Sequence, residues 1–194
     1  MPENEMWTYN RYNQLEGRIR QLGVNLGAAG DRRGENGTMW LEWPSVGGES
    51  PEISIEVQPE QLPCYRRHAV GYNGVLPWVA SSWVGDLESI TINLNYGDAA
   101  KNPPAKQSGK YTLRLFFAEP EDLQPGQRLF DVVVADQPPI ENLDIVKEAG
   151  APRRGIVKEM KGIVAQDKIT VTLKSKTKPP FGALLCGFEL IPEP

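Results

Sequence analysis

The chain has 194 residues, of which 40% are hydrophobic and 24% are charged, and its formal net charge is -4. A chain of this length can bury one substantial hydrophobic core, and it contains no apolar run long enough to cross a bilayer. Because phosphate recognition depends on clustered Lys and Arg, the acidic balance argues against a nucleic-acid partner. We therefore expect one soluble globular domain with no membrane span.

The first predicted element is a short N-terminal helix over residues 10–22. Four apolar residues recur there at the spacing of one helix face, namely Tyr12, Leu15, Ile19 and Leu22. Gly23 follows at the position where such a helix would end. We expect residues 1–23 to be a helical extension packed on a β-domain that spans residues 24–194.

From residue 53 onward the hydrophobic period changes to two, which predicts half-buried strands. The expected strands are Ile53–Val57, Ile90–Leu94, Tyr111–Phe117, Arg128–Ala135, Ile156–Val164, Ile169–Leu173 and Leu184–Ile191. Residues 121–126 turn the chain between the third and fourth of these strands, and we expect those two strands to form a hairpin. Many short strands separated by Gly and Pro turns predict an all-β sandwich or barrel.

The sequence lacks the motifs of the common cofactor sites and reactive centres. There is no P-loop, no dinucleotide fingerprint and no Gly-x-Ser-x-Gly elbow. His68 is the only histidine, and with two distant cysteines it cannot complete a zinc site. Strand phase places Cys186 with Phe188 and Leu190, which favours a buried free thiol, although a bridge to Cys64 is the alternative. We expect no cofactor and no metal.

A set of short motifs runs through the second half of the chain. In chain order they are Tyr111–Glu119 (YTLRLFFAE), Gly126–Val132 (GQRLFDV), Asn142–Val146 (NLDIV), Ile169–Leu173 (ITVTL) and Leu185–Ile191 (LCGFELI). Together they resemble the strands of malectin and malectin-like domains, and Val24–Gly27 and Gly37–Trp40 resemble the start of that fold more loosely. The resemblance implies a galactose-binding-type jelly-roll β-sandwich and a non-catalytic carbohydrate-binding function.

The segment Leu76–Ser82 resembles a bacterial version of the module, in which it closes a larger secreted or envelope protein. The resemblance therefore implies a secreted or cell-envelope protein, with other domains of a parent chain as partners. Residues 1–7 carry Glu3 and Glu5 where a signal peptide would have a basic segment. Either the leader is absent from this chain or the protein is cytosolic.

Candidate ligand contacts follow from the chemistry of sugar recognition. An aromatic ring packs on the apolar face of a pyranose, while amides, carboxylates and guanidinium groups pair with its hydroxyls. The candidates of these types are Trp43, Tyr65, Arg66, His68, Tyr72, Trp78, Trp83 and Glu119. A core position is the alternative for each Trp and the favoured one for Trp40. Arg66 and Arg67 alternate sides on a strand, so one is expected to face a cleft and the other to form a surface ion pair.

Two segments depart from the family pattern. Glucose-binding members of the family place an aromatic pair directly after the Phe-Ala-Glu motif, whereas Pro120–Asp122 follow here. Before the last strand those members carry aromatics and an acid, and this chain has Pro179–Gly182. These departures favour an alternative function, in which the sandwich binds a protein partner or is a structural module of a larger chain.

A third hypothesis is glycoside hydrolysis by a pair of carboxylates, Glu119 and Asp131. Strand alternation predicts an outward or edge position for both side chains. Carboxylates on sheet faces commonly pair with arginines, here Arg114 or Arg128, and we favour that structural interpretation.

Overall fold

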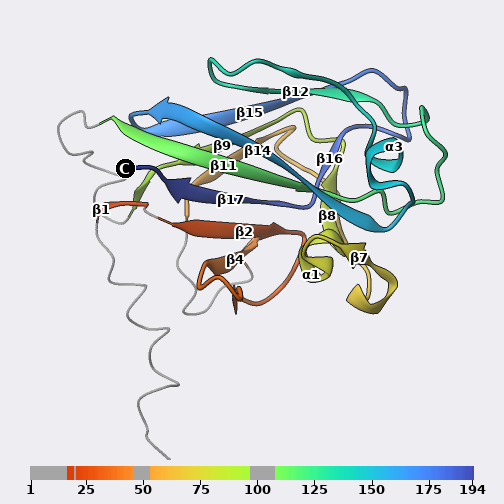
Figure 1. The fold of residues 1–194 in the computed structure, drawn as a ribbon, viewed down its shortest axis with the longest axis horizontal. Coiled ribbons are helices and arrows are strands. Elements are labelled where there is room, and N and C mark those ends of the chain that lie inside the picture. Colours follow the sequence, from red (N-terminus) through yellow and green to blue (C-terminus); the bar gives the residue numbers. More distant parts are fainter. Residues whose placement is uncertain (1–16, 20, 46–52, 97–107) are drawn as a thin grey trace, which may run out of the picture.

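The computed structural model describes residues 17–19, 21–45, 53–96 and 108–194, and most of its regular elements are strands (Figure 1). The helical elements are short, namely η2 (Ala69–Gly71), α1 (Pro77–Ala80) and α3 (Ile145–Ala149). The expected all-β sandwich is confirmed. No helix within the described ranges is long and apolar enough to cross a membrane.

The larger sheet has seven strands in the order β3-β4-β2-β17-β11-β14-β7. Their bounds are β2 (Leu22–Leu26), β3 (Arg32–Arg33), β4 (Met39–Trp43), β7 (Asn73–Gly74), β11 (Gly109–Phe117), β14 (Arg154–Ala165) and β17 (Gly187–Pro192). β2 pairs with β4 in parallel and β7 with β14 in parallel, and the other pairs are antiparallel. Leu113, Leu115 and Phe117 of β11 are fully buried, so the middle of this sheet forms one wall of the core.

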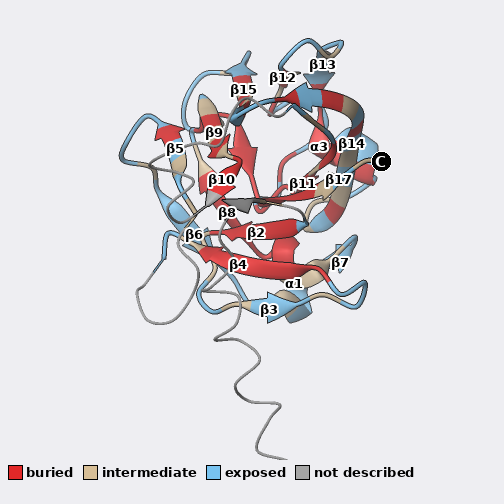
Figure 2. Ribbon diagram, turned by 90° about the vertical axis from the view of Figure 1, so that its left-hand side faces the viewer, coloured by how far each residue is buried: buried red, intermediate tan, exposed pale blue. Residues whose placement is uncertain are grey.

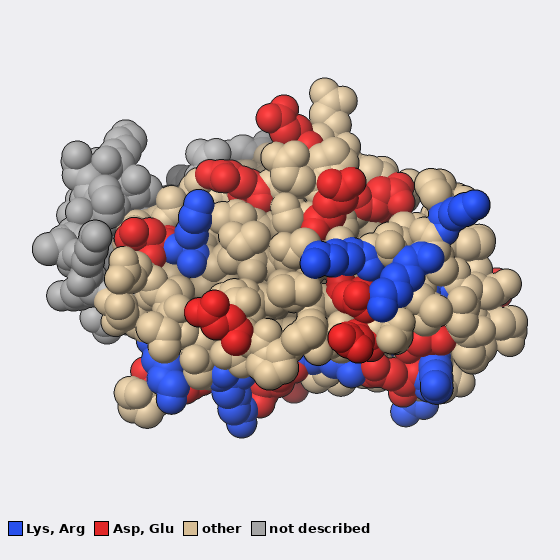
Figure 3. Space-filling view, turned by 90° about the horizontal axis from the view of Figure 1, so that it is seen from above, with Lys and Arg blue, Asp and Glu red and all other residues tan. Residues whose placement is uncertain are grey.

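The second sheet has five strands in the order β13-β12-β15-β9-β5. Their bounds are β5 (Ile55–Gln58), β9 (Ser89–Asn93), β12 (Phe130–Val134), β13 (Ile140–Leu143) and β15 (Lys168–Ser175). Ile90 and Ile92 are fully buried between partly exposed polar neighbours, as the alternation predicts. The two sheets curl around a common interior lined by buried residues (Figure 2). Viewed from above, the molecule shows acidic and basic side chains intermixed on its surface (Figure 3).

Two small sheets complete the fold. One pairs β1 (Gly17–Arg18) with β10 (Asn95–Tyr96), and the other has the order β16-β8-β6. The strands of the latter are β6 (Cys64–Arg66), β8 (Ser82–Gly85) and β16 (Leu184–Leu185). The last strand expected from the sequence is therefore divided at Cys186: β16 pairs with β8, while β17 joins the large sheet.

The expected hairpin between residues 111–117 and 128–135 is wrong. β11 lies between β14 and β17 in the seven-stranded sheet, whereas β12 lies between β13 and β15 in the other. The two strands face each other across the core, where the rings of Phe117 and Phe130 are 5.8 Å apart. Alternation shows only that one face of each strand is buried, and it does not distinguish neighbours in one sheet from strands in opposite sheets. Residues 118–129 carry the chain from one sheet to the other.

The described part of the expected N-terminal helix is also extended. Gly17–Arg18 is β1, and Leu22 begins β2, all five residues of which are buried. The spacing of the apolar residues is helical, but β2 lies between β4 and β17, and pairing on both edges overrides the local pattern. The remainder of that predicted helix lies outside the described residues.

Both cysteines are free in this structure, as expected. Cys64 is exposed and Cys186 is buried in the core. Burial raises the pKa of the Cys186 thiol to about 12. The buried thiol is therefore protonated at neutral pH and behaves as a small apolar core residue.

A buried ion pair anchors the segment that crosses between the sheets. Glu119 is fully buried, and its carboxylate accepts hydrogen bonds from Arg128 Nε at 2.7 Å and Nη2 at 3.3 Å. Glu119 Oε1 also accepts the backbone N–H of Glu121, at 3.0 Å, and Arg128 Nη1 donates to the carbonyl of Gly182. The outward position expected for Glu119 is wrong, because the chain has already left the sheet there, but Arg128 is confirmed as its partner.

We expect Glu119→Gln to lower the free energy of unfolding by about 3–5 kcal/mol, because it leaves the Arg128 charge buried without a counter-charge. Urea denaturation measures this change. The matched control is Glu121→Gln, which breaks an exposed pair with Arg67 and should cost no more than about 1 kcal/mol. Equal losses in the two variants would contradict the anchoring role of Glu119.

Candidate ligand-binding site

Two cavities lie beside β6, and they share Arg66 and Arg67 in their walls. The Tyr65 cavity, about 570 Å³, is lined by Tyr65, Arg66, Arg67, Trp83, Gly85, Asp86, Pro120, Glu121, Asp122, Leu123, Arg128, Pro180, Phe181 and Leu184. The Trp78 cavity, about 490 Å³, is lined by Asn25, Ala28, Ala29, Gly30, Arg32, Trp40, Arg66, Arg67, His68, Ala69, Trp78 and Ser81. Both volumes suit a small ligand.

The aromatic wall of the Tyr65 cavity is a cross-strand pair. Tyr65 on β6 is the register partner of Trp83 on β8, and their rings stack at 5.2 Å between centroids with a 20° interplanar angle. Trp83 is 5% exposed, whereas Tyr65 is 46% exposed. The Arg67 guanidinium lies 5.5 Å from the centre of the Trp83 ring. A buried indole thus supports an accessible phenol ring at the edge of the cavity.

The opposite wall of the Tyr65 cavity comes from the crossing segment and from the chain before β16. Glu121 pairs with Arg67 at 2.8 Å, and Asp122 pairs with Arg153 at 2.8 Å. Arg128 contributes its guanidinium, which lies 5.8 Å from the centre of the Phe181 ring. Carboxylates and guanidinium groups therefore stand together beside the aromatic wall, so the cavity can both accept and donate hydrogen bonds.

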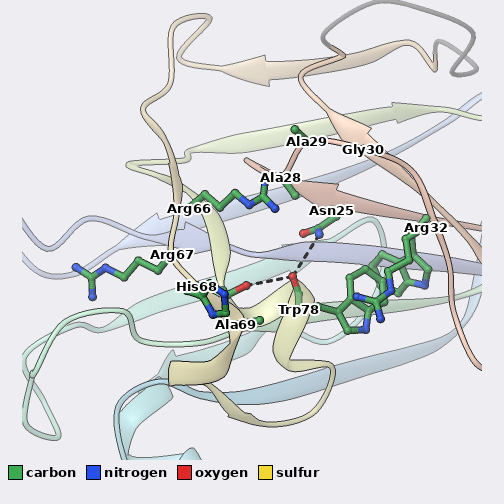
Figure 4. A pocket seen from close by; sticks show the side chains of 12 residues that line it. Asn25, Ala28, Ala29, Gly30, Arg32, Arg66, Arg67, His68, Ala69 and Trp78 are labelled. Atoms are coloured by element: carbon green, nitrogen blue, oxygen red, sulfur yellow. Dashed lines mark hydrogen bonds between the residues drawn. The ribbon is translucent and has the colours of Figure 1, made fainter.

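The Trp78 cavity is built around two indoles. Trp40 and Trp78 meet edge to face at 5.2 Å, and the Arg32 guanidinium lies 4.7 Å from the centre of the Trp78 ring. Figure 4 shows Arg32 against Trp78 on one side of the cavity, Arg66 on another side and Arg67 turned away. Trp40 is almost fully buried, which confirms the core position expected for it.

A buried amide fixes the position of Trp78. Asn25 on β2 accepts a hydrogen bond from Ser82 Oγ at 2.8 Å, and its Nδ2 donates to the Trp78 carbonyl at 3.4 Å. Ser81 Oγ donates to the same carbonyl at 3.3 Å. Leu76, the residue before α1, has a φ of 43°, and Trp78 is the second residue of this short helix. β2, α1 and β8 are therefore held together at the floor of the cavity.

The structure distributes the candidate residues between the two cavities. Tyr65 and Trp83 line the first, His68 and Trp78 line the second, and Arg66 lines both. Arg67 forms the ion pair expected for one of the two adjacent arginines.

Three candidates line neither cavity. Tyr72 is 4% exposed and Glu119 is fully buried, and their ligand contacts stay predictions. Tyr72 follows η2 and packs into the core, and the carboxylate of Glu119 is paired with Arg128. Trp43, at the end of β4, is partly buried against the core, and its assignment stays a prediction.

Several lining residues were not among the sequence candidates, notably Asn25, Arg32, Arg128 and Phe181. Phe181 lies in the segment that the family comparison had marked as departing from the pattern. The other three carry no local signal, because each reaches its cavity through contacts between strands distant in the sequence.

The two carboxylates of the hydrolase hypothesis are not brought to one cavity. Asp131 on β12 accepts the backbone N–H of Asn142 at 2.7 Å and pairs with Lys176 at 2.8 Å. The hydrogen bond from Lys176 lowers the pKa of Asp131. Neither Asp131 nor Glu119 lines either cavity described above, and both are held by basic partners. Within the described residues, no group of three or more His, Cys, Asp or Glu could hold a metal ion.

The chain is similar to known proteins in its second half by sequence and over most of its length by structure. A family model for the malectin domain matches residues 95–180. A search of curated proteins found no match. A solved Bacteroides uniformis β-glucuronidase 2, a calcium-binding mutant, is similar with a TM-score of 0.63 and 16% identity, over 90% of this chain and 18% of that chain.

Two plant proteins show the same fold. The ANXUR2 extracellular domain from Arabidopsis thaliana matches with a TM-score of 0.58 and 15% identity, over 90% of this chain and 48% of that chain. The plant receptor-like kinase FER matches with a TM-score of 0.55 and 17% identity, over 90% of this chain and 42% of that chain. This chain thus spans less than half the length of each of these solved chains. At these sequence identities the similarity shows a shared fold.

We expect Asn25→Ala to lower the free energy of unfolding by about 1–3 kcal/mol, because it leaves the buried hydroxyl of Ser82 with only the carbonyl of Val79, at 3.5 Å, as an acceptor. Urea denaturation measures this loss, and near-UV circular dichroism should report the altered setting of Trp78. The control is Asn73→Ala on the exposed strand β7, which should change stability by less than about 0.5 kcal/mol. An Asn25→Ala protein as stable as the control would show that the amide does not hold the cavity floor.

Proposed function

We propose that this chain binds a carbohydrate at the Tyr65 cavity without transforming it, because a family model for the malectin domain matches residues 95–180 and the described residues form a β-sandwich with a cavity of suitable lining. The domain is of a kind that typically binds carbohydrate. The particular site, and the absence of a chemical step, are our inference.

The observation that carries the proposal is the exposed Tyr65 ring stacked on the buried Trp83 ring, beside charged groups of both signs. The apolar face of a pyranose can pack on the phenol ring of Tyr65. Around it, Glu121 and Asp122 can accept hydrogen bonds from sugar hydroxyls, and Arg67 can donate them. A pair of rings that already stack on one another loses little conformational freedom when a ligand binds.

The Tyr65 cavity is lined by the two segments in which this chain departs from the glucose-binding members of the family. Its wall contains Pro120–Asp122 and Pro180–Phe181, from the two segments in which glucose-binding members carry aromatic contacts. In this chain the stacking surface comes instead from β6 and β8, with Phe181 adding one ring from the second segment. The loss of the family's aromatic pair is thus compatible with a sugar-binding site in the same place.

A volume of about 570 Å³ accommodates a mono- or disaccharide. The groups in the wall are suited to orienting such a ligand, because Glu121 and Asp122 are paired with arginines and no nucleophile–base pair stands among the lining residues described. We propose a binding module that works as one part of a larger secreted or envelope protein.

The experiment is a glycan array probed with the whole chain, followed by calorimetric titration of the neutral saccharide that binds. We expect Tyr65→Ala to weaken binding at least about tenfold, equivalent to about 1.4 kcal/mol, because it removes the stacking surface. Tyr65→Phe keeps the ring and should retain affinity within about threefold.

Tyr65 is on the surface, with 46% of its area exposed, so the variants should keep the thermal midpoint of the parent protein to within a few degrees. A silent array combined with specific capture of a protein partner would favour the alternative of a protein-interaction module. Saccharide binding that is unchanged in Tyr65→Ala would place the site elsewhere.

A further inference from the structure

The Trp78 cavity has a charge distribution unlike that of the Tyr65 cavity. Its charged lining residues are all arginines, Arg32, Arg66 and Arg67, and its twelve lining residues include no Asp or Glu. The Tyr65 cavity, by contrast, includes Asp86, Glu121 and Asp122. A wholly basic cavity in a chain of net charge -4 is a local departure from the overall charge. From this we propose that the Trp78 cavity is a second binding site, for a small ring-containing ligand that bears an oxyanion group.

Two of the three guanidinium groups are available to such a ligand. Arg67 is engaged with Glu121 and with the carbonyl of Pro120, and it extends away from the cavity (Figure 4). Arg66 forms no side-chain hydrogen bond or ion pair with the described part of the chain. Arg32 has its contact with the Trp78 ring, which leaves its N–H groups unsatisfied by any described carboxylate. A guanidinium fork matches the spacing of two oxygens in a carboxylate, sulfate or phosphate ester.

His68 adds a hydrogen-bond donor to the cavity wall. Its Nδ1 accepts the backbone N–H of Val70 at 3.3 Å, within the cap of η2. Because Nδ1 accepts, a ring proton lies on Nε2, which can donate a hydrogen bond. The ring lines the cavity and faces the same space as Arg66 (Figure 4).

Two carboxylates near this cavity in the chain, Asp31 and Glu42, make hydrogen bonds that close the loop between β2 and β3. Glu42 Oε2 accepts the N–H of Gly30 at 2.5 Å, and Asp31 Oδ1 accepts the N–H of Glu42 at 3.1 Å. Neither residue lines the cavity. These acids shape the loop that carries Ala28 and Ala29 into the wall, and they do not form ion pairs with Arg66.

The rest of the wall includes apolar side chains that suit the body of a ligand. Ala28, Ala29 and Ala69 line the cavity together with the indole of Trp78, and the cavity volume of about 490 Å³ exceeds that of a bare inorganic anion. The Trp78 ring is held by Arg32 on one face and by Trp40 at its edge, so the surface is already ordered before a ligand arrives. The geometry therefore fits an oxyanion at the arginines and a ring beside the alanines.

The test is a titration of the isotope-labelled chain followed by NMR, with three probes: a sulfated monosaccharide, the same monosaccharide without sulfate, and inorganic sulfate. We expect the sulfated sugar to shift the indole N–H resonance of Trp78 and the amides of residues 28–32, and its affinity to fall as salt rises. Arg32→Gln should weaken this binding at least about tenfold, since it removes a charge-assisted contact. Arg66→Gln, on the other wall, should do the same.

The matched control is Arg33→Gln, which removes an equal charge from the same exposed strand at a residue outside the cavity. Its affinity should remain that of the parent chain, and thermal midpoints should show all three variants folded. Equal weakening by Arg32→Gln and Arg33→Gln would mean non-specific attraction and overturn the proposal. Equal shifts with the unsulfated sugar, shifts confined to Tyr65 and Phe181, or no shifts at all would overturn it too. If inorganic sulfate bound as tightly as the sulfated sugar, the sugar ring would contribute nothing to affinity, and the proposal of a ring-containing ligand would be overturned.

Discussion

The structure depends most on the buried ion pair between Glu119 and Arg128. Their charges can remain inside the protein only because each satisfies the other, together with the amide of Glu121 and the carbonyl of Gly182. The same contacts tie the segment that crosses between the sheets to the chain that precedes β16. These two segments form one wall of the Tyr65 cavity, so the proposed sugar site is fixed by an interaction of the core.

The small sheet β16-β8-β6 contributes residues to two cavities of different charge. β6 and β8 supply the stacked rings of Tyr65 and Trp83 to one cavity, while the end of β6 supplies Arg66 to both. Arg67, the residue after β6, pairs with Glu121 in the mixed-charge cavity. Arg66 has no side-chain partner within the described part of the chain, so its N–H groups are available to a ligand in the basic cavity. A neutral glycan and an oxyanion could thus be bound by one module at two separate places.

Sequence reasoning located most strands but not their partners. The alternation over residues 169–173 and 90–94 gave both position and buried face, because each strand has one face in the core. It could not show that β11 and β12 lie in opposite sheets, and helical spacing before Gly23 was overridden by pairing of β2 on both edges. Of the cavity linings, the aromatic residues Tyr65, Trp78 and Trp83 were candidates from the sequence, because each is an aromatic with polar neighbours. The pairing of Glu119 with Arg128 was predicted, but the burial of the pair was not, because burial at a crossing between sheets leaves no periodic signal.

The account rests on the claim that a neutral saccharide packs on Tyr65. A crystal structure of the chain soaked with a mixture of neutral mono- and disaccharides tests this most directly. We expect a sugar ring lying against the exposed face of Tyr65, with its hydroxyls hydrogen-bonded to Glu121 or Asp122. Saccharide density in any other place, with the Tyr65 cavity holding solvent, would contradict the account.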